Sequence, residues 1–79
     1  MSKEEILARV IELMADSFEM DPAEIVSTAH LFDDLDLDSI DAIDLAVRLE
    51  ERTSISFNDE DLKAIRTIRD VVNLIDGRL

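Results

Sequence analysis

The sequence predicts an all-α protein: a four-helix bundle with three longer helices, a short third helix and a long loop between the first two. Apolar residues recur at three- and four-residue spacing in separate segments, and a capping signature precedes each segment. Only one Gly and one Pro interrupt the 79 residues, and 47% of them are hydrophobic, unlike a disordered tail. We therefore expect one folded domain over residues 1–79.

The first helix is expected over residues 3–17, because Ser2 and Glu5 form a capping box ahead of an apolar pattern. That pattern consists of Ile6, Leu7, Val10, Ile11, Leu13, Met14 and Phe18. Pro22 interrupts the helical spacing, and the apolar residues from 20 to 38 are scattered. This stretch is predicted to be an ordered loop. The residues expected to pin it are Ile25, Val26, Leu31, Phe32, Leu35 and Leu37.

Three more helices follow from local signals. Asp38 is a suitable N-cap for a helix over residues 39–51, with acids in its first turns where the helix dipole favours them. Asn58 can cap a short helix over residues 59–64. Thr67 and Asp70 repeat the capping signature before a helix over residues 68–76, and Gly77 is a suitable stop.

The charge of the chain narrows the possible partners. Twenty acidic and eight basic residues give a net charge of −12, which disfavours binding to nucleic acids and anionic lipids and favours encounter with basic protein surfaces. Without Cys, the chain has no thiol nucleophile or thiolate metal site. No apolar run approaches the roughly 20 residues of a membrane span. We therefore expect a cytoplasmic monomer that does not insert into membranes.

The helix expected over residues 39–51 has two apolar faces at about 100° per residue. The core face consists of Ala42, Leu45, Ala46 and Leu49. The second stripe consists of Ile40, Ile43 and Val47, and its acidic rim consists of Asp44, Glu50 and Glu51. Burial of the stripe under the long loop is one interpretation. The acidic rim favours the other, an exposed surface that docks partner proteins.

Ser39 is predicted at the first helical position, where its hydroxyl can project into solvent. A serine near a helix start is also common for capping reasons alone. A self-activated nucleophile is disfavoured, because His30 is the only histidine and no oxyanion-hole loop is evident. We assign no catalytic residue and do not expect an enzyme. If Ser39 reacts, another protein performs the chemistry.

A calcium loop is a competing interpretation of Asp34, Asp36 and Asp38, which have the spacing of its first ligands. The sixth and twelfth positions of such a loop require Gly and Glu. Here they hold Ser39 and Leu45, so no metal site is predicted. Loose binding of divalent ions by the clustered acids stays open.

Together these features resemble the acyl carrier protein family over nearly the whole chain. Asp38-Ser39-Ile40 stands where the family has its Asp-Ser-Leu attachment motif, after Leu31-Phe32-Asp33-Asp34-Leu35 and before an acidic helix. The resemblance implies that a phosphopantetheinyl transferase moves 4'-phosphopantetheine from coenzyme A to Ser39. Acyl intermediates of fatty-acid or polyketide-like lipid synthesis would then travel on this arm as thioesters. The implied partners are a ketosynthase, a reductase, a dehydratase and an acyltransferase.

The resemblance also assigns roles to individual residues. Basic patches of partners would meet Asp38, Asp41, Asp44, Glu50 and Glu51, and apolar sites would receive Ile40, Ile43 and Val47. Leu49 and Ile65 would line an acyl cavity, with ordinary core packing as the alternative.

One departure from the family concerns a Gly common two residues before the serine, which is here Leu37 and is expected to add an apolar side chain beside the arm. The run from 34 to 45 looks most like carriers of specialised pathways such as aryl polyene synthesis. An acidic interaction domain without a prosthetic group and a carrier of aminoacyl or peptidyl groups are the alternative functions.

Overall fold

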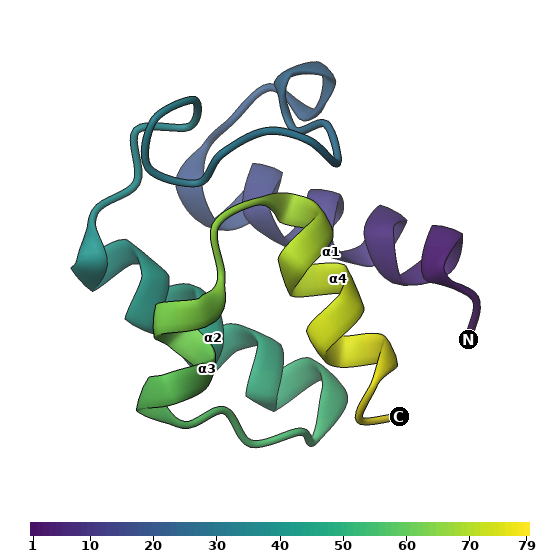
Figure 1. Cartoon of the computed structure of the whole chain (residues 1–79). Helices are drawn as coiled ribbons and strands as arrows, with labels where there is room; N and C mark the ends of the chain where they lie inside the picture. Colours follow the sequence, from purple (N-terminus) through teal and green to yellow (C-terminus); the bar gives the residue numbers. More distant parts are fainter.

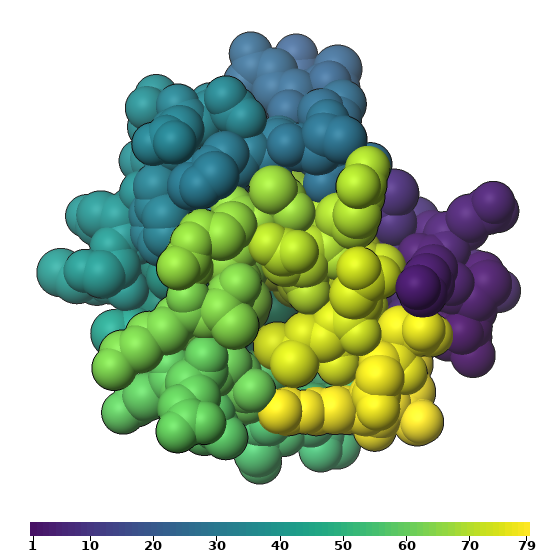
Figure 2. Space-filling model, viewed as in Figure 1, coloured from purple at the N-terminus to yellow at the C-terminus, as the bar shows by residue number.

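The computed structural model describes all residues from 1 to 79 and contains four α-helices and no strand. The helices are α1 (Lys3–Phe18), α2 (Ser39–Thr53), α3 (Asp59–Ala64) and α4 (Ile68–Asp76), with one turn of 3-10 helix, η1 (Pro22–Glu24), in the long loop. The predicted all-α fold with a short third helix is confirmed (Figure 1). In the space-filling view α3 and α4 form the near face, in front of α2 (Figure 2).

Two helices end slightly later than predicted. α1 continues to Phe18 and α2 to Thr53, and each is followed by a residue in the left-handed region, Glu19 (φ 54°) or Ser54 (φ 61°). The amide of Ser54 donates to the carbonyl of Glu50 at 2.9 Å, which satisfies the helix end without a glycine. α3 and α4 have the predicted bounds. Gly77 is the C-cap of α4, but its φ of −67° requires no glycine.

Reciprocal capping boxes begin three of the helices. In each, the N-cap side chain accepts from a backbone amide three residues on, and that residue's carboxylate accepts from the amide of the N-cap. The pairs are Asp38–Asp41 in α2, Asn58–Asp61 in α3 and Thr67–Asp70 in α4. Local sequence therefore specifies where these helices start.

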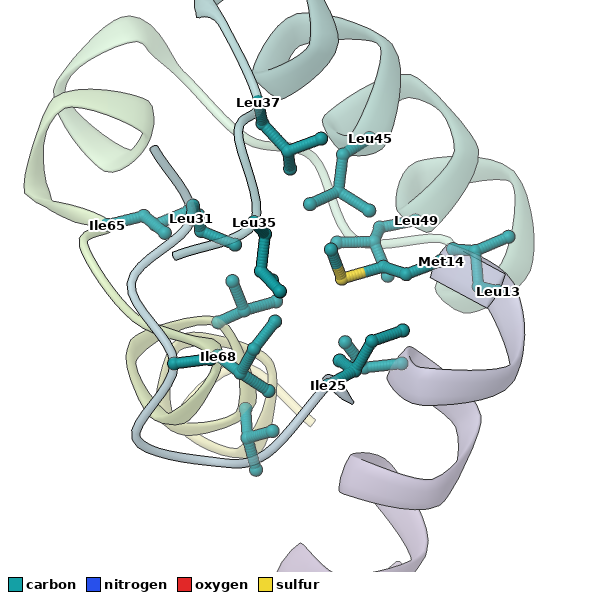
Figure 3. Packing of buried hydrophobic residues seen from close by; sticks show 14 of the residues in the cluster. Leu13, Met14, Ile25, Leu31, Leu35, Leu37, Leu45, Leu49, Ile65 and Ile68 are labelled. Carbon is teal, nitrogen blue, oxygen red and sulfur yellow. The ribbon is translucent and has the colours of Figure 1, made fainter. Parts of the chain in front are cut away.

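A single apolar core joins the helices to the long loop. Sixteen buried residues form one cluster, and none of the buried residues is polar. Met14 of α1, Ile68 of α4 and the loop residues Ile25 and Leu31 point into it together (Figure 3). The loop is therefore pinned by its apolar side chains as predicted. Val26 is the exception, because 51% of its surface is exposed.

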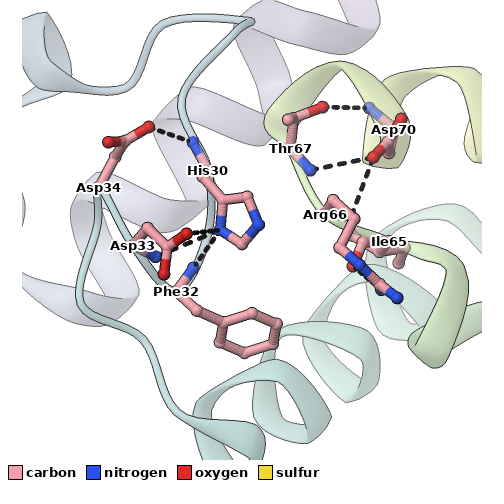
Figure 4. A network of polar contacts seen from close by, with 8 residues as sticks. All are labelled: His30, Phe32, Asp33, Asp34, Ile65, Arg66, Thr67 and Asp70. Carbon is pink, nitrogen blue, oxygen red and sulfur yellow. Dashed lines mark hydrogen bonds and ion pairs between the residues drawn. The ribbon is translucent and has the colours of Figure 1, made fainter.

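Backbone hydrogen bonds also attach the loop to the turn between α3 and α4. The Leu31 amide donates to the Arg66 carbonyl at 2.9 Å, and the Ile68 amide donates to the Ala29 carbonyl at 3.1 Å. His30 lies opposite Thr67 in an isolated antiparallel bridge. Its Nδ1 accepts hydrogen bonds from the amides two and three residues on, both at 3.2 Å, so His30 has a local structural role (Figure 4).

The prediction that Leu37 places an apolar side chain beside the arm is wrong. Leu37 is buried in the core, and its amide donates to the Leu31 carbonyl at 3.1 Å. The residue that uses unusual backbone freedom is Asp36, with φ 57°, three positions before Ser39. Aspartate tolerates the left-handed region better than most residues. The chain therefore turns at Asp36, and Leu37 faces inward.

Candidate functional site

Ser39 is exposed at the first position of α2, as the sequence predicted. The Asp38 Oδ1 accepts from the Asp41 amide at 2.9 Å, and the Asp41 Oδ2 accepts from the Asp38 amide at 3.1 Å. These two bonds hold the backbone on either side of Ser39. The Ser39 hydroxyl itself makes no hydrogen bond within the protein. The hydroxyl is therefore open to solvent at a fixed helix start.

An open groove of about 590 Å³ begins at Ser39 and runs between α2 and α3. Its lining residues are Phe32, Ser39, Ala42, Ile43, Asp59, Leu62, Lys63 and Arg66. This volume is in the range of small-molecule sites, and the mixture of apolar and charged residues suits a ligand that is partly polar. Sequence reasoning did not identify the groove, because its two walls come from separate helices.

The two faces predicted for α2 are present in the structure. Leu45, Ala46 and Leu49 are buried, whereas 55% of Ile43 and 48% of Val47 are exposed. Ile40, at the start of the same stripe, is 74% exposed. The long loop does not cover the stripe, so the interpretation in which it is buried is wrong. α2 presents three aliphatic side chains to solvent.

Most of the acids around this stripe have partners within the protein. Asp41 belongs to the capping box, and the Asp44 Oδ1 lies 3.2 Å from the Arg48 Nε. The Glu50 Oε1 accepts from the Phe57 amide at 2.8 Å, which ties α2 to the segment before α3. Glu51 is exposed and makes no hydrogen bond or ion pair in the structure. The predicted acidic rim is present, and Glu51 is the one member of it whose carboxylate has no partner within the protein.

Leu49 and Ile65, the two residues predicted to line an acyl cavity, do line one small apolar space. It has a volume of only about 10 Å³, close to that of a single water-sized site. All ten of its lining residues are hydrophobic: Leu31, Phe32, Ala42, Leu45, Ala46, Leu49, Phe57, Leu62, Ile65 and Val71. α2, α3 and the segments around them therefore meet over an apolar seam that adjoins the groove at Ser39.

Two of the three carboxylates in the Asp34–Asp38 run accept hydrogen bonds from backbone amides. The Asp34 Oδ2 accepts from the His30 amide at 2.7 Å, and Asp38 caps α2. The structure contains no group of three or more His, Cys, Asp or Glu side chains arranged to hold a metal ion. No helix has both the length and the apolar character required to span a membrane.

Two carboxylates have a lowered pKa, and both hold α3 and α4 in place. For Asp70, burial is the largest influence and raises the pKa, but bonds from the Thr67 and Arg66 amides and the Thr67 hydroxyl together hold it below the ordinary 3.8. For Asp61, the two-pronged hydrogen bond from the Arg78 guanidinium is the main cause of the lowered pKa. These groups stabilise the scaffold that forms the groove.

Comparison with known proteins shows which class this fold and site define. A family model described as "Phosphopantetheine attachment site" matches residues 8–75, a range that includes Ser39. The chain thus contains a phosphopantetheine-binding domain. It is 43% identical to acyl carrier protein 2 of Ralstonia nicotianae over 79 residues, covering 100% of this chain and 98% of that protein.

Two further relatives agree. The acyl carrier protein of Micrococcus luteus is 38% identical over 76 residues, which cover 96% of this chain and 94% of that protein. The meromycolate extension acyl carrier protein of Mycobacterium tuberculosis is 36% identical over 75 residues, covering 95% and 65% respectively. The chain belongs to the acyl carrier protein family. Proteins of this family carry covalent 4'-phosphopantetheine and are carriers rather than catalysts.

Proposed function

We propose that Ser39 carries the 4'-phosphopantetheine and that this chain shuttles acyl intermediates, as thioesters, between biosynthetic enzymes. The observation that carries the proposal is the exposed Ser39 hydroxyl, which has no internal partner and stands on the helix start clamped by Asp38 and Asp41. Because the chain has no Cys, the thiol of the thioester is the chemistry that the prosthetic group supplies.

The residues around Ser39 suit this group. The pantetheine arm has apolar carbons, two amides and an anionic phosphodiester, and the adjoining groove has matching character. Phe32, Ala42 and Leu62 provide apolar contact area, and Lys63 and Arg66 provide positive charge. The capping box keeps Ser39 in one position, so that a transferase meets a preorganised nucleophile and the chain loses little entropy on binding.

The exposed side of α2 is the proposed docking surface for partners. Ile40, Ile43 and Val47 would enter shallow apolar sites, while Asp44 and Glu51 face basic patches and Asp38, Asp41 and Glu50 add negative charge nearby. The partners are the phosphopantetheinyl transferase, followed by a ketosynthase, a reductase, a dehydratase and an acyltransferase. Exposed ion pairs contribute below about 1 kcal/mol each, which allows rapid release of each partner.

The cargo is an acyl chain of fatty-acid or polyketide-like lipid synthesis. The apolar seam around Leu49 and Ile65 would shelter it between visits, and α2 and α3 would have to separate because the space is now only about 10 Å³. One relative is named for meromycolate extension, and the 34–45 run suggests a specialised pathway such as aryl polyene synthesis. The proposal extends to a monomer in the cytoplasm, where the transferase has access to coenzyme A.

The direct test is modification of the apo protein. Incubation with coenzyme A and a broad-specificity phosphopantetheinyl transferase should add one phosphopantetheine, measured as intact mass. Ser39→Ala should remain unmodified, whereas Ser56→Ala, which removes another exposed serine hydroxyl, should be modified like the wild type. A wild-type protein that stays unmodified beside a modified control carrier would refute the proposal.

The same experiment separates the alternative functions. An acidic interaction domain without a prosthetic group stays unmodified. A carrier of aminoacyl or peptidyl groups is modified as well, and the thioester cargo recovered from the host distinguishes it from an acyl carrier.

A further inference from the structure

Two cations line the groove at Ser39, in a protein with twenty acids and eight bases. Lys63 lies in the last turn of α3, and Arg66 lies in the turn between α3 and α4. The charges nearest Ser39 at the start of α2, Asp38 and Asp41, are negative, and Asp59 also lines this groove. A pair of cations beside the attachment serine is therefore a local reversal of the overall charge.

Neither cation forms a close ion pair with a carboxylate, although the charge of Arg66 helps to lower the pKa of Asp70. The ion pairs that Lys and Arg side chains form in the structure are Asp44–Arg48 and Asp61–Arg78. Lys63 makes no side-chain hydrogen bond. Arg66 uses only Nη1, which donates to the carbonyls of Lys63 and Ile65.

This arrangement leaves Arg66 fixed but with free donors. Its side chain extends away from the Asp70 carboxylate (Figure 4), and its Nε and Nη2 hydrogens have no acceptor in the protein. A guanidinium held by one nitrogen with its other donors free is preorganised for an anion, and phosphate oxygens match its geometry. Lys63 adds a mobile point charge beside it.

We propose that Lys63 and Arg66 bind the phosphodiester of the prosthetic group on Ser39 and so hold the arm in the groove between α2 and α3. The inference rests on the proposed attachment at Ser39. Modification places one negative charge at the Ser39 Oγ, next to the acids of the capping box. The two cations offset that repulsion, and Phe32 and Leu62 supply apolar contact for the arm beyond the phosphate.

A purely structural role for these cations makes a different prediction. Lys63 near the end of α3 interacts favourably with the helix dipole, and Arg66 caps carbonyls of the same helix. Both effects exist without the prosthetic group and stabilise the apo and holo proteins equally. A phosphate-binding role exists in the holo protein alone. The comparison between the two forms therefore separates the roles.

The experiment compares the wild type with the Lys63→Ala/Arg66→Ala double variant, each as apo protein and as holo protein verified by intact mass. Two NMR readouts are used: the ³¹P signal of the phosphodiester, and nuclear Overhauser effects from the geminal methyl groups of the arm to Leu62. The control is Lys3→Ala/Arg69→Ala, which removes two positive charges that line a different groove. A salt titration of the wild-type holo protein repeats the measurement without any substitution.

In the holo Lys63→Ala/Arg66→Ala variant, we expect a changed ³¹P chemical shift and weaker nuclear Overhauser effects between the arm and Leu62. The control variant should give the wild-type signals. The ratio of docked to free arm should fall about two- to fivefold, the effect of losing exposed ion pairs, and salt should change the wild type in the same direction. Signals that match the wild type, together with no response to salt, would overturn the inference while leaving the attachment intact. A wild-type mass without the added group would instead overturn the proposed function.

Discussion

Asp38 and Asp41 accept hydrogen bonds from each other's backbone amides, at 2.9 and 3.1 Å, and Ser39 lies between them. Each carboxylate is therefore part of the helix start as well as part of the acidic surface. Replacing either one changes the presentation of Ser39 and the charge together. Tests of docking must use other residues, and tests of the cap must preserve the charge or vary it separately.

Substitutions at Asp38 should separate capping from charge. Asp38→Ala removes the acceptor for the Asp41 amide, so the free energy of unfolding should fall by about 1 kcal/mol. Asp38→Asn keeps an acceptor for the Asp41 amide, so its free energy of unfolding should fall by only a small part of that amount. Urea denaturation of both variants measures the difference. Equal losses in the two variants would mean that charge, and not the cap, stabilises this helix start.

Val47 and Val26 offer a matched test of the proposed docking surface on α2, because the two side chains are similarly exposed. Val47 in α2 is 48% exposed, and Val26 in the long loop is 51% exposed. Val47→Ser should lower kcat/KM for the transferase roughly fivefold, the effect of losing about 1 kcal/mol of apolar burial at the interface. Val26→Ser, in the long loop, should leave it unchanged. Both variants should stay within about 0.5 kcal/mol of wild-type stability. Similar rates for all three proteins would exclude Val47 from the docking surface.

Glu51 is the best probe of electrostatic steering, because it is exposed and has no partner within the protein. Glu51→Lys should slow modification by the transferase at low ionic strength, and the difference from wild type should shrink as salt is added. Glu12→Lys applies the same change of charge on α1 and is the control. Equal slowing by both variants would indicate that net charge, rather than the α2 surface, governs encounter.

Acid should destabilise the protein through Asp61 and Asp70. Both have a folded-state pKa below the ordinary 3.8, so they bind protons less readily when folded than when unfolded. Their contribution to the stability of the folded protein is present above about pH 4. It is lost as the pH falls through their lower folded-state pKa values. Thermal unfolding of wild type and Asp70→Asn between pH 6 and pH 2.5 measures this. A destabilisation of the same size in both proteins would exclude Asp70 as a cause.

The sequence predicted those parts of the fold that depend on neighbours within one helical turn. The N-caps Asp38, Asn58 and Thr67 each act on the amide three residues on, and periodicity separated Leu45 from Ile43 on opposite faces of α2. The Asp44–Arg48 pair has four-residue spacing and could have been predicted from the same rule. No glycine follows α1 or α2 to mark where the helix ends. The predicted ends were therefore earlier than the observed ends at Phe18 and Thr53.

Contacts between distant segments were not predictable in this way. Nothing local indicates that Glu50 accepts from the Phe57 amide or that Arg78 reaches Asp61. The inward position of Leu37 also required the structure, because it depends on the left-handed turn at Asp36 and on space left in the core. A hydrophobic residue in a loop does not by itself reveal which way it faces.

By itself, the sequence determined the positions of the helices, the placement of Ser39 at the capped start of α2 and the resemblance to a carrier family. Each of these depends on the spacing of residues along the chain. Only the tertiary structure decided what surrounds that serine. Packing of α3 beside α2 brings Lys63 and Arg66 to the groove of Ser39 and closes the apolar seam around Leu49 and Ile65. The physical reason is that a groove between helices depends on how their buried faces meet, which no single helix specifies.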